Sequence, residues 1–266
     1  MRPKILTVLF LTVMVLYSFS TPFLFPTGEL IVVPEGHTLS EIANMFANRG
    51  VVRSAFAFKL LAKLASASGS LKAGRYIFRK PVPIWEVLKS IAIGDYGTRR
   101  IKVSVPEGYS NKQISELVGL DLGEENQGYL FPDTYFFDEF VTIAEVRKTM
   151  LDNFASKVAS STPETVIIAS ILEEEVQSKN DMKIVAGILY KRIKLGMPLQ
   201  VDSVPWTYQN EGLPPVPVSN SGLQALEAAR IPETSSYLYY LSDKDGLTHY
   251  AKTFEEHKVN KARYLR

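Results

Sequence analysis

A helix-like run of almost purely apolar residues ends in three consecutive glutamates, and this meeting of hydrophobic surface and charge constrains the chain most. The run extends from Pro163 to Leu172 and is followed by Glu173, Glu174 and Glu175. Carboxylates seldom lie beside so much hydrophobic surface unless they are paired or used in chemistry. A carboxyl group against an apolar wall keeps its proton more readily, so it can act as a general acid near neutral pH. The alternative interpretation is a charged helix end that points into water.

A helical projection distinguishes the three glutamates from one another. At about 100° per residue, Glu175 falls inside the apolar arc that contains Ile168 and Leu172. Periodicity therefore predicts that Glu175 is the most buried of the three carboxyl groups. Glu173 and Glu174 fall at opposite margins of the arc. A catalytic acid has to be partly desolvated but open to substrate, so Glu173 suits that role well.

The amino terminus predicts a membrane anchor. Arg2 and Lys4 precede an uncharged stretch from Ile5 to Gly28, which is about the length that spans a bilayer. Because the basic residues come first and none follows closely, the amino terminus should remain cytoplasmic. We therefore expect a cytoplasmic tail at residues 1–4 and a transmembrane anchor at residues 5–26. A cleaved signal peptide is the competing interpretation, but the chain has no Ala-x-Ala site before its first alanine, Ala43.

Composition narrows the function classes. The chain has 266 residues, enough for one large or two ordinary domains, and a net charge of +2. Basic residues occur singly or in pairs and form no longer run, so nucleic-acid binding has little support. The absence of cysteine excludes disulfides and thiolate chemistry. The three histidines are too scattered to indicate a metal site, and no phosphate-binding, nucleophile-elbow or zinc-protease motif is present. We expect no metal and no cofactor.

One element occurs twice, at residues 33–42 and 105–114, and the two copies align without a gap. Each copy indicates a strand, a Pro-Glu-Gly turn and a helix that opens with a capping box. The repeat is interpreted as structural first and says little about chemistry. The capping pairs are Thr38 with Glu41 and Ser110 with Gln113.

The remaining pattern predicts an α+β chain with two modules, at residues 29–97 and 101–266. The second module should open with a half-buried strand, since Ile101, Val103 and Val105 alternate with polar residues. An extended segment after Gly196 places Gln200 and Asp202 on one face, either as the polar wall of a cleft or as a strand edge. Further helices are expected at 55–67, 83–92, 143–157, 163–177 and about 180–195, followed by a hairpin within 237–251 and a last helix opened by Thr253.

Taken in order, several short segments resemble the YceG-like endolytic murein transglycosylases over nearly the whole chain. Each segment is a weak signal alone, and their joint order is a strong one. The segments are the amino-terminal anchor, Val33-Pro-Glu-Gly-His, Leu71-Lys-Ala-Gly-Arg-Tyr, Val105-Pro-Glu-Gly-Tyr, Tyr129-Leu-Phe-Pro-Asp-Thr-Tyr, Ala169-Ser-Ile-Leu-Glu, Leu199-Gln-Val-Asp, Gly212-Leu-Pro-Pro and Glu256-His257.

The resemblance implies a single-pass protein of the bacterial cytoplasmic membrane whose main domains face the cell wall. The first module would be similar to LysM glycan-binding domains. The second would be a lyase, a lytic transglycosylase that cleaves bonds within nascent peptidoglycan strands and leaves 1,6-anhydro-N-acetylmuramic acid ends. The implied partners are peptidoglycan, the membrane, penicillin-binding proteins and other wall-synthesis proteins.

The resemblance also implies roles for particular residues. Glu173 corresponds to the family's catalytic glutamate, which acts as general acid and base. The implied substrate-binding residues are Glu175, Gln200, Asp202, Thr207 and Tyr208.

The chain departs from the family pattern beside the expected cleft. A longer insertion after Asp202 is missing, Trp206 stands where the family has asparagine, Gln127 stands where it usually has glutamate, and Val216 replaces a glycine. The departures leave an alternative open, a catalytically weakened scaffold that binds peptidoglycan within the wall-synthesis machinery. A periplasmic chaperone or small-ligand binder has no motif in its favour.

Overall fold

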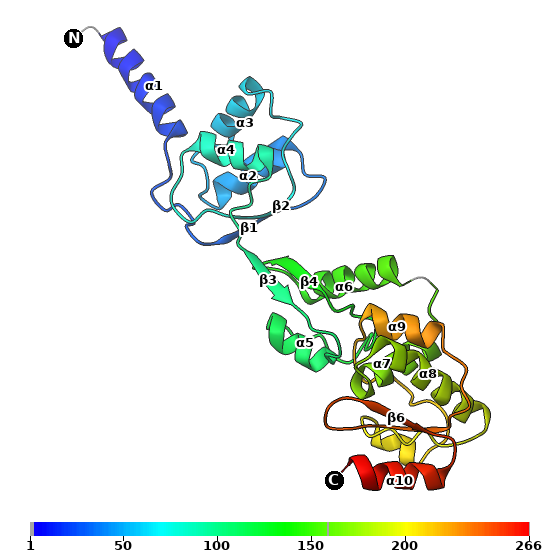
Figure 1. The fold of residues 1–266 in the computed structure, drawn as a ribbon. Helices are drawn as coiled ribbons and strands as arrows, with labels where there is room; N and C mark the ends of the chain where they lie inside the picture. Colours follow the sequence, from blue (N-terminus) through cyan, green and yellow to red (C-terminus); the bar gives the residue numbers. More distant parts are fainter. Residues whose placement is uncertain (1–2, 159, 266) are drawn as a thin grey trace. The chain divides into compact units, whose positions relative to one another are not determined.

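A computed structural model describes residues 3–158 and 160–265 (Figure 1). The chain divides into two compact units, residues 1–99 and residues 100–266. The structure combines helices with two-stranded antiparallel sheets, which confirms the predicted α+β class. Arg2, in the expected cytoplasmic tail, lies outside the described residues.

The amino-terminal stretch forms helix α1, Pro3–Phe19. The expected anchor at residues 5–26 therefore extends past the end of this helix. Among residues 3–158 and 160–265, no helix combines the length and the apolar character needed to cross a membrane. The carboxyl-terminal end of α1 is attached to the rest of its unit by Arg53, whose guanidinium donates to the Tyr17 hydroxyl at 2.6 Å and lies 4.1 Å from the centre of that ring.

The first unit packs three helices against one antiparallel strand pair. The helix after its first strand carries the predicted capping box, since Thr38 and Glu41 exchange side-chain to backbone bonds. Phe46, Phe58 and Tyr76 are completely buried in its core. The elements are β1 Leu30–Val33, α2 Leu39–Asn48, α3 Ala55–Leu64, β2 Gly74–Ile77 and α4 Ile84–Ile93.

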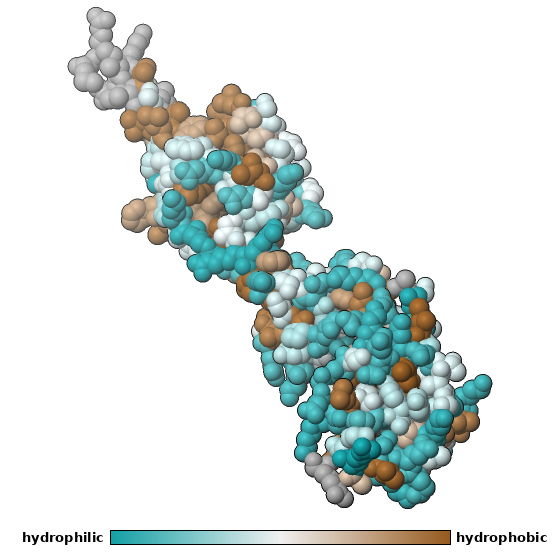
Figure 2. All heavy atoms as spheres, in the orientation of Figure 1, coloured by the Kyte–Doolittle hydropathy of each residue, from teal (hydrophilic) through white to brown (hydrophobic). Residues whose placement is uncertain are grey.

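One face of α3 is apolar yet exposed. Phe56, Leu60 and Leu64 lie at helical spacing on it and are 72%, 39% and 74% exposed. Phe23 and Leu24, just after α1, are more exposed still, at 92% and 83%. Figure 2 shows hydrophobic residues gathered at the end of this unit that carries α1 and α3. The first unit thus presents unburied apolar surface near the amino-terminal helix.

The second unit begins with the other copy of the repeated element. Its capping box is also confirmed, because Ser110 accepts from the Gln113 amide and Gln113 bonds back to the cap. The strand prediction needs one correction: Val103 and Val105 are buried, but Ile101 is 48% exposed, because the small core beneath these strands does not extend to it. The elements are β3 Arg100–Ser104, α5 Asn111–Val118, β4 Thr134–Asp138 and α6 Ile143–Lys157, with β3 and β4 antiparallel.

The apolar helix ending in glutamates, α7 Pro163–Glu175, lies at the centre of the second unit. Every residue from Thr165 to Leu172 is buried, because α8 and α9 pack on it. A helix covered on all sides has no single apolar arc. Helix α7 also ends two residues before the predicted boundary. The elements around it are α8 Lys179–Lys194, η1 Pro205–Tyr208, α9 Leu223–Arg230, β5 Tyr239–Ser242, β6 Thr248–Ala251 and α10 Phe254–Tyr264.

Candidate active site

Glu173 lies in the last turn of α7, where the helix emerges from the core. Its carboxylate is half-buried and accepts a hydrogen bond from the Gly222 amide at 2.9 Å. Gly222 is the residue that caps α9. Glu107 approaches the same glycine so closely that an added Cβ there would lie 1.9 Å from its carboxylate oxygen. Two carboxylates therefore flank the amino terminus of α9.

The surroundings of Glu173 favour its protonated form. Burial raises the pKa of Glu173 above its ordinary value, and the negative charges of Glu107 and Glu174 raise it further. The hydrogen bond from Gly222 acts in the opposite direction without reversing the shift. A carboxyl group that holds its proton at higher pH, at an accessible helix end, is suited to general acid catalysis.

The second Pro-Glu-Gly turn contributes directly to this site. Gly108 has a left-handed backbone, with φ of +79°, and a Cβ there would lie 3.5 Å from Cγ of Glu173. The equivalent glycine of the first copy, Gly36, has no atom of the described residues within 4 Å of such a Cβ. The repeat, interpreted from the sequence as structural first, thus also brings a turn into the candidate site in its second copy.

Asn220 ties this turn to the loop before α9. The side chain is 1% exposed and makes three hydrogen bonds. Its oxygen accepts from the Leu130 amide at 2.9 Å, and its nitrogen donates to the Tyr109 carbonyl at 2.9 Å and to Oδ1 of Asn111 at 3.0 Å. The Gly108 amide donates to the Asn220 carbonyl as well. Asn220 thus fixes both loops that contact Glu173.

Sequence analysis missed Glu107, Asn220 and Gly222 as parts of the site. The only local signal was a polar Ser-Asn-Ser-Gly run before an apolar helix. The contacts of Asn220 join residues about 90 to 111 positions apart, and a local pattern cannot show such contacts.

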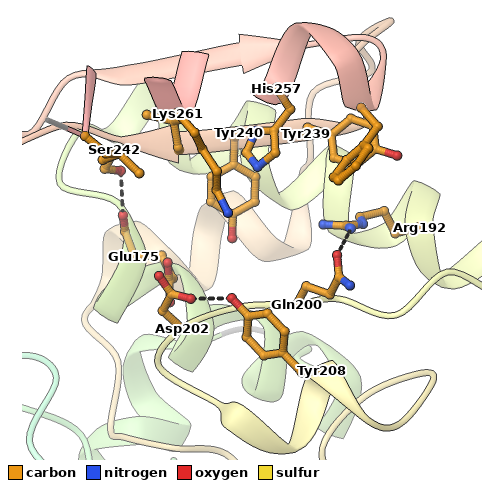
Figure 3. Close-up of a pocket in the computed structure, with 13 residues that line it drawn as sticks. Glu175, Arg192, Gln200, Asp202, Tyr208, Tyr239, Tyr240, Ser242, His257 and Lys261 are labelled. Atoms are coloured by element: carbon orange, nitrogen blue, oxygen red, sulfur yellow. Dashed lines mark hydrogen bonds between the residues drawn. The ribbon is translucent and has the colours of Figure 1, made fainter. Parts of the chain in front are cut away.

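A pocket of about 370 Å³ brings together four of the six predicted site residues (Figure 3). Glu175, Gln200, Asp202 and Tyr208 line it, whereas Glu173 does not. The other lining residues are Arg192, Tyr239, Tyr240, Leu241, Ser242, Phe254, His257, Lys261 and Leu265.

The fifth substrate-binding candidate, Thr207, is completely buried beneath the pocket. Its hydroxyl donates to the Val204 carbonyl at 2.7 Å and accepts from the Val201 amide at 3.0 Å. Thr207 therefore shapes the loop that carries the pocket residues, and its side chain is not available to a ligand.

A second hollow, of about 300 Å³, adjoins the first and reaches the catalytic candidate. Glu173, Glu174 and Glu175 line it together with the turn of the β5–β6 hairpin. Glu175 and Ser242 line both hollows, so the two cavities meet at the end of α7. Five of the six predicted residues thus lie along two adjacent hollows, and Glu173 occupies a different one from Gln200 and Asp202.

Glu175 joins the end of α7 to two other segments. Its carboxylate accepts from the Ser203 amide at 2.9 Å, and its carbonyl accepts from the Ser242 hydroxyl at 3.0 Å. The prediction that Glu175 is the most buried carboxyl is not confirmed, because Glu173 and Glu175 are both half-buried. A helical projection identifies a buried face only where the opposite face is exposed, and the helix before Glu173 is buried on all sides.

Asp202 lies in a tight turn, and Gln200 just before it does not have the extended conformation that the sequence predicted. Gln200 has a left-handed backbone, with φ of +51°, and its side-chain oxygen accepts from Arg192 at 3.2 Å. Asp202 accepts a hydrogen bond from the Tyr208 hydroxyl, which raises the pKa of Tyr208 to about 12. Both side chains nevertheless reach the same pocket.

The structure shows where three of the departures from the family pattern lie. Trp206, in η1, is 39% exposed and lines neither hollow. Gln127 is a structural link, because its oxygen accepts from the Asn111 amide at 2.8 Å and its nitrogen donates to the Val218 carbonyl at 2.7 Å. Val216, in the loop before Val218, is 60% exposed. Across the described residues, no group of three or more potential metal ligands occurs.

Comparison with known proteins identifies the family. The model of the YceG-like family matches residues 31–205 and 203–263. A Bacillus subtilis protein named endolytic murein transglycosylase is 28% identical over 305 residues, covering 88% of this chain and 84% of the relative. A relative of the same name from Streptococcus pneumoniae is 26% identical over 318 residues, and the match covers 88% of this chain but only 58% of that protein.

A solved structure supports the same family assignment. The crystal structure of a yceG-like protein from Listeria monocytogenes is similar to this chain with a TM-score of 0.53 and 25% sequence identity. The match covers 88% of this chain and all of that one. Because the family model spans nearly the whole chain, the protein belongs to the YceG-like family.

Proposed function

We propose that this chain is a lytic murein transglycosylase that cleaves the bond between N-acetylmuramic acid and N-acetylglucosamine within peptidoglycan strands. The names of the curated relatives support murein as the substrate. The observation that supports the reaction type is the position of Glu173. Its carboxyl group is half-buried at the end of a buried helix, and burial raises its pKa.

In the proposed reaction, Glu173 acts first as an acid and then as a base. Its proton passes to the glycosidic oxygen as the bond from C1 of the muramic residue breaks. The carboxylate then takes the proton of the C6 hydroxyl, and O6 bonds to C1 to close a 1,6-anhydro ring. The internal nucleophile replaces both water and the second catalytic carboxylate that ordinary glycosidases use.

The neighbouring residues support this cycle in different ways. The Gly222 amide holds the Glu173 carboxylate in one orientation, and the charge of Glu107 favours the protonated form that starts the cycle. Glu175 is proposed as a positioning residue, because it links α7 to the loop at Ser203. Gln200, Asp202 and Tyr208 are proposed to contact substrate from the adjoining pocket, while Thr207 supports their loop.

We also propose that the protein is anchored in the bacterial cytoplasmic membrane by its amino-terminal segment, with the two units facing the cell wall. The basic residues before an uncharged stretch support this orientation. The exposed apolar face of α3 supports a location close to lipid. The first unit is proposed to bind glycan in the manner of a LysM-like module, and penicillin-binding proteins and other wall-synthesis proteins are the proposed partners.

Isotope labelling tests the reaction type. The wild-type protein and Glu173→Gln are incubated with peptidoglycan in H₂¹⁸O, and the released fragments are analysed by mass spectrometry. The proposal predicts anhydro ends without ¹⁸O from the wild type and none from Glu173→Gln. Reducing ends that carry ¹⁸O would indicate hydrolysis and contradict it.

A second outcome is specific to this sequence. If neither protein releases fragments but the wild type sediments with insoluble peptidoglycan, the chain is the scaffold that its altered cleft suggests. The missing insertion and Trp206 are the observations that favour this outcome.

A further inference from the structure

The pocket beside the candidate active site has two ends of opposite charge (Figure 3). Arg192 lies on one side of it, Glu175 and Asp202 lie on the other, and His257 and Lys261 reach into it between them. The walls between them carry tyrosines. A cavity of about 370 Å³ with this distribution is matched to a ligand that carries both an anionic and a cationic group.

The pocket contains a buried guanidinium that no carboxylate of the described residues pairs. Arg192 is 5% exposed, and its two terminal nitrogens donate to the Leu199 carbonyl at 2.9 Å and to Oε1 of Gln200 at 3.2 Å. Its Nε has no hydrogen-bond partner within the described part of the chain. Buried charges in proteins are ordinarily paired, so this one is left for an anion from outside the chain.

Two more polar atoms of the same pocket have unused hydrogen-bonding capacity. The Tyr240 hydroxyl and Nδ1 of His257 are buried and make no hydrogen bond to any residue that the structure describes. Burial and the nearby charges of Lys261 and Arg192 lower the pKa of His257, so the ring is neutral and can accept or donate. Buried polar groups are nearly always satisfied, so three unsatisfied groups on residues that line one cavity make it a candidate site for a polar ligand.

We propose that this pocket binds the peptide stem of the murein substrate through a free carboxylate of the stem. Arg192 and Lys261 would hold the carboxylate, since guanidinium and ammonium groups make charge-assisted hydrogen bonds to it. Glu175 and Asp202 would face the amino group of a diamino acid in the same stem. The inference rests on the proposed function, because it assigns one arm of the same substrate to this pocket.

The position of the pocket agrees with this assignment. It meets the hollow of Glu173 at Glu175 and Ser242. A stem is attached to the lactyl group of a muramic residue, so it extends sideways from the glycan. A glycan that places its scissile bond at Glu173 can therefore direct its stem into the adjoining pocket. Substrate selection by stem composition would follow.

A comparison of two substrates tests the proposal on the full-length protein. Each variant is given stem-bearing glycan strands and strands from which an amidase has removed the stems, and the ratio of the two kcat/KM values is measured. Lys261→Ala leaves the fold intact, since Lys261 is exposed, and Arg192→Gln removes the buried charge. Arg263→Ala is the matched control, because Arg263 is an exposed cation of the same helix outside the pocket.

The expected result is a fall of about tenfold in this ratio for Lys261→Ala and for Arg192→Gln, mainly through KM on stem-bearing strands. Arg263→Ala should keep the wild-type ratio. Equal ratios in all four proteins would overturn the proposal. If the wild type cleaves neither substrate, the proposed function has failed and the binding measurement below decides this inference separately.

Calorimetry provides that measurement without turnover. A free stem tripeptide that ends in a diamino acid with a free carboxylate is titrated into the wild type and into Lys261→Ala. The proposal predicts binding that weakens about tenfold in the variant and in a peptide with an amidated carboxyl end. Absence of binding to the wild type, or equal affinity for the amidated peptide, would contradict it.

Discussion

Replacement of Asn220 by alanine should destabilise the second unit and loosen the site. The side chain makes three hydrogen bonds, to the Leu130 amide, the Tyr109 carbonyl and Asn111. Each bond contributes about 1 kcal/mol net, and a buried partner left without one costs about 1–3 kcal/mol. The Leu130 amide and Oδ1 of Asn111 would lose their hydrogen-bond partner. The Tyr109 carbonyl would still accept a hydrogen bond from the backbone amide of residue 220. We expect a loss of about 3–5 kcal/mol in the free energy of unfolding.

Urea unfolding followed by tryptophan fluorescence measures this loss. The chain contains two tryptophans, Trp85 in the first unit and Trp206 in the second. Because Trp85 is 59% exposed, a Trp85→Phe background should fold normally and report only the second unit. The control is Asn210→Ala, which removes one exposed hydrogen bond to the Trp206 carbonyl and should cost less than about 1 kcal/mol.

A comparison of the two asparagine variants can refute the role given to Asn220. If Asn220→Ala and Asn210→Ala shift the unfolding midpoint equally, the three buried hydrogen bonds do not hold the two loops together. Asn220→Ala should also lose activity under conditions where it remains folded, because Gly222 is no longer held against Glu173. Full activity in the folded variant would show that this contact is dispensable.

Two further predictions concern charge and hydrogen bonding near the site. Glu107→Gln removes a charge that raises the pKa of Glu173, so the acid form is lost at lower pH. The high-pH limb of the kcat/KM profile should move to lower pH, and a move to higher pH would contradict the assignment. Gln127→Glu cannot donate to the Val218 carbonyl and should destabilise the second unit by about 1–3 kcal/mol in the same urea assay. The exposed control Gln224→Glu should leave the midpoint nearly unchanged.

Local signals predicted the elements well where their cause is local. The capping boxes at Thr38 and Ser110 formed as expected, because a cap depends on residues three positions apart. The hairpin and the last helix, opened by Thr253, also match the pattern. The α+β class follows from these local elements.

The site was harder to predict because its geometry depends on contacts between distant segments. The depth of Glu175 was misjudged because α7 is covered on every side up to Leu172, and periodicity detects only a one-sided core. The role of Asn220 depends on partners about 90 positions or more away in sequence. Gln200 was expected in an extended segment, but a left-handed residue turns the chain there.

The most direct test of the central claim compares all three glutamates at the end of α7. Glu173→Gln, Glu174→Gln and Glu175→Gln are incubated with purified peptidoglycan, and the yield of 1,6-anhydro ends is measured with circular dichroism as a check on folding. Glu174 is exposed and Glu175 supports a loop. We therefore predict that only Glu173→Gln abolishes the product, while Glu174→Gln retains most of the wild-type yield and Glu175→Gln part of it. Product from folded Glu173→Gln at the wild-type level would contradict the assignment of Glu173 as the catalytic acid.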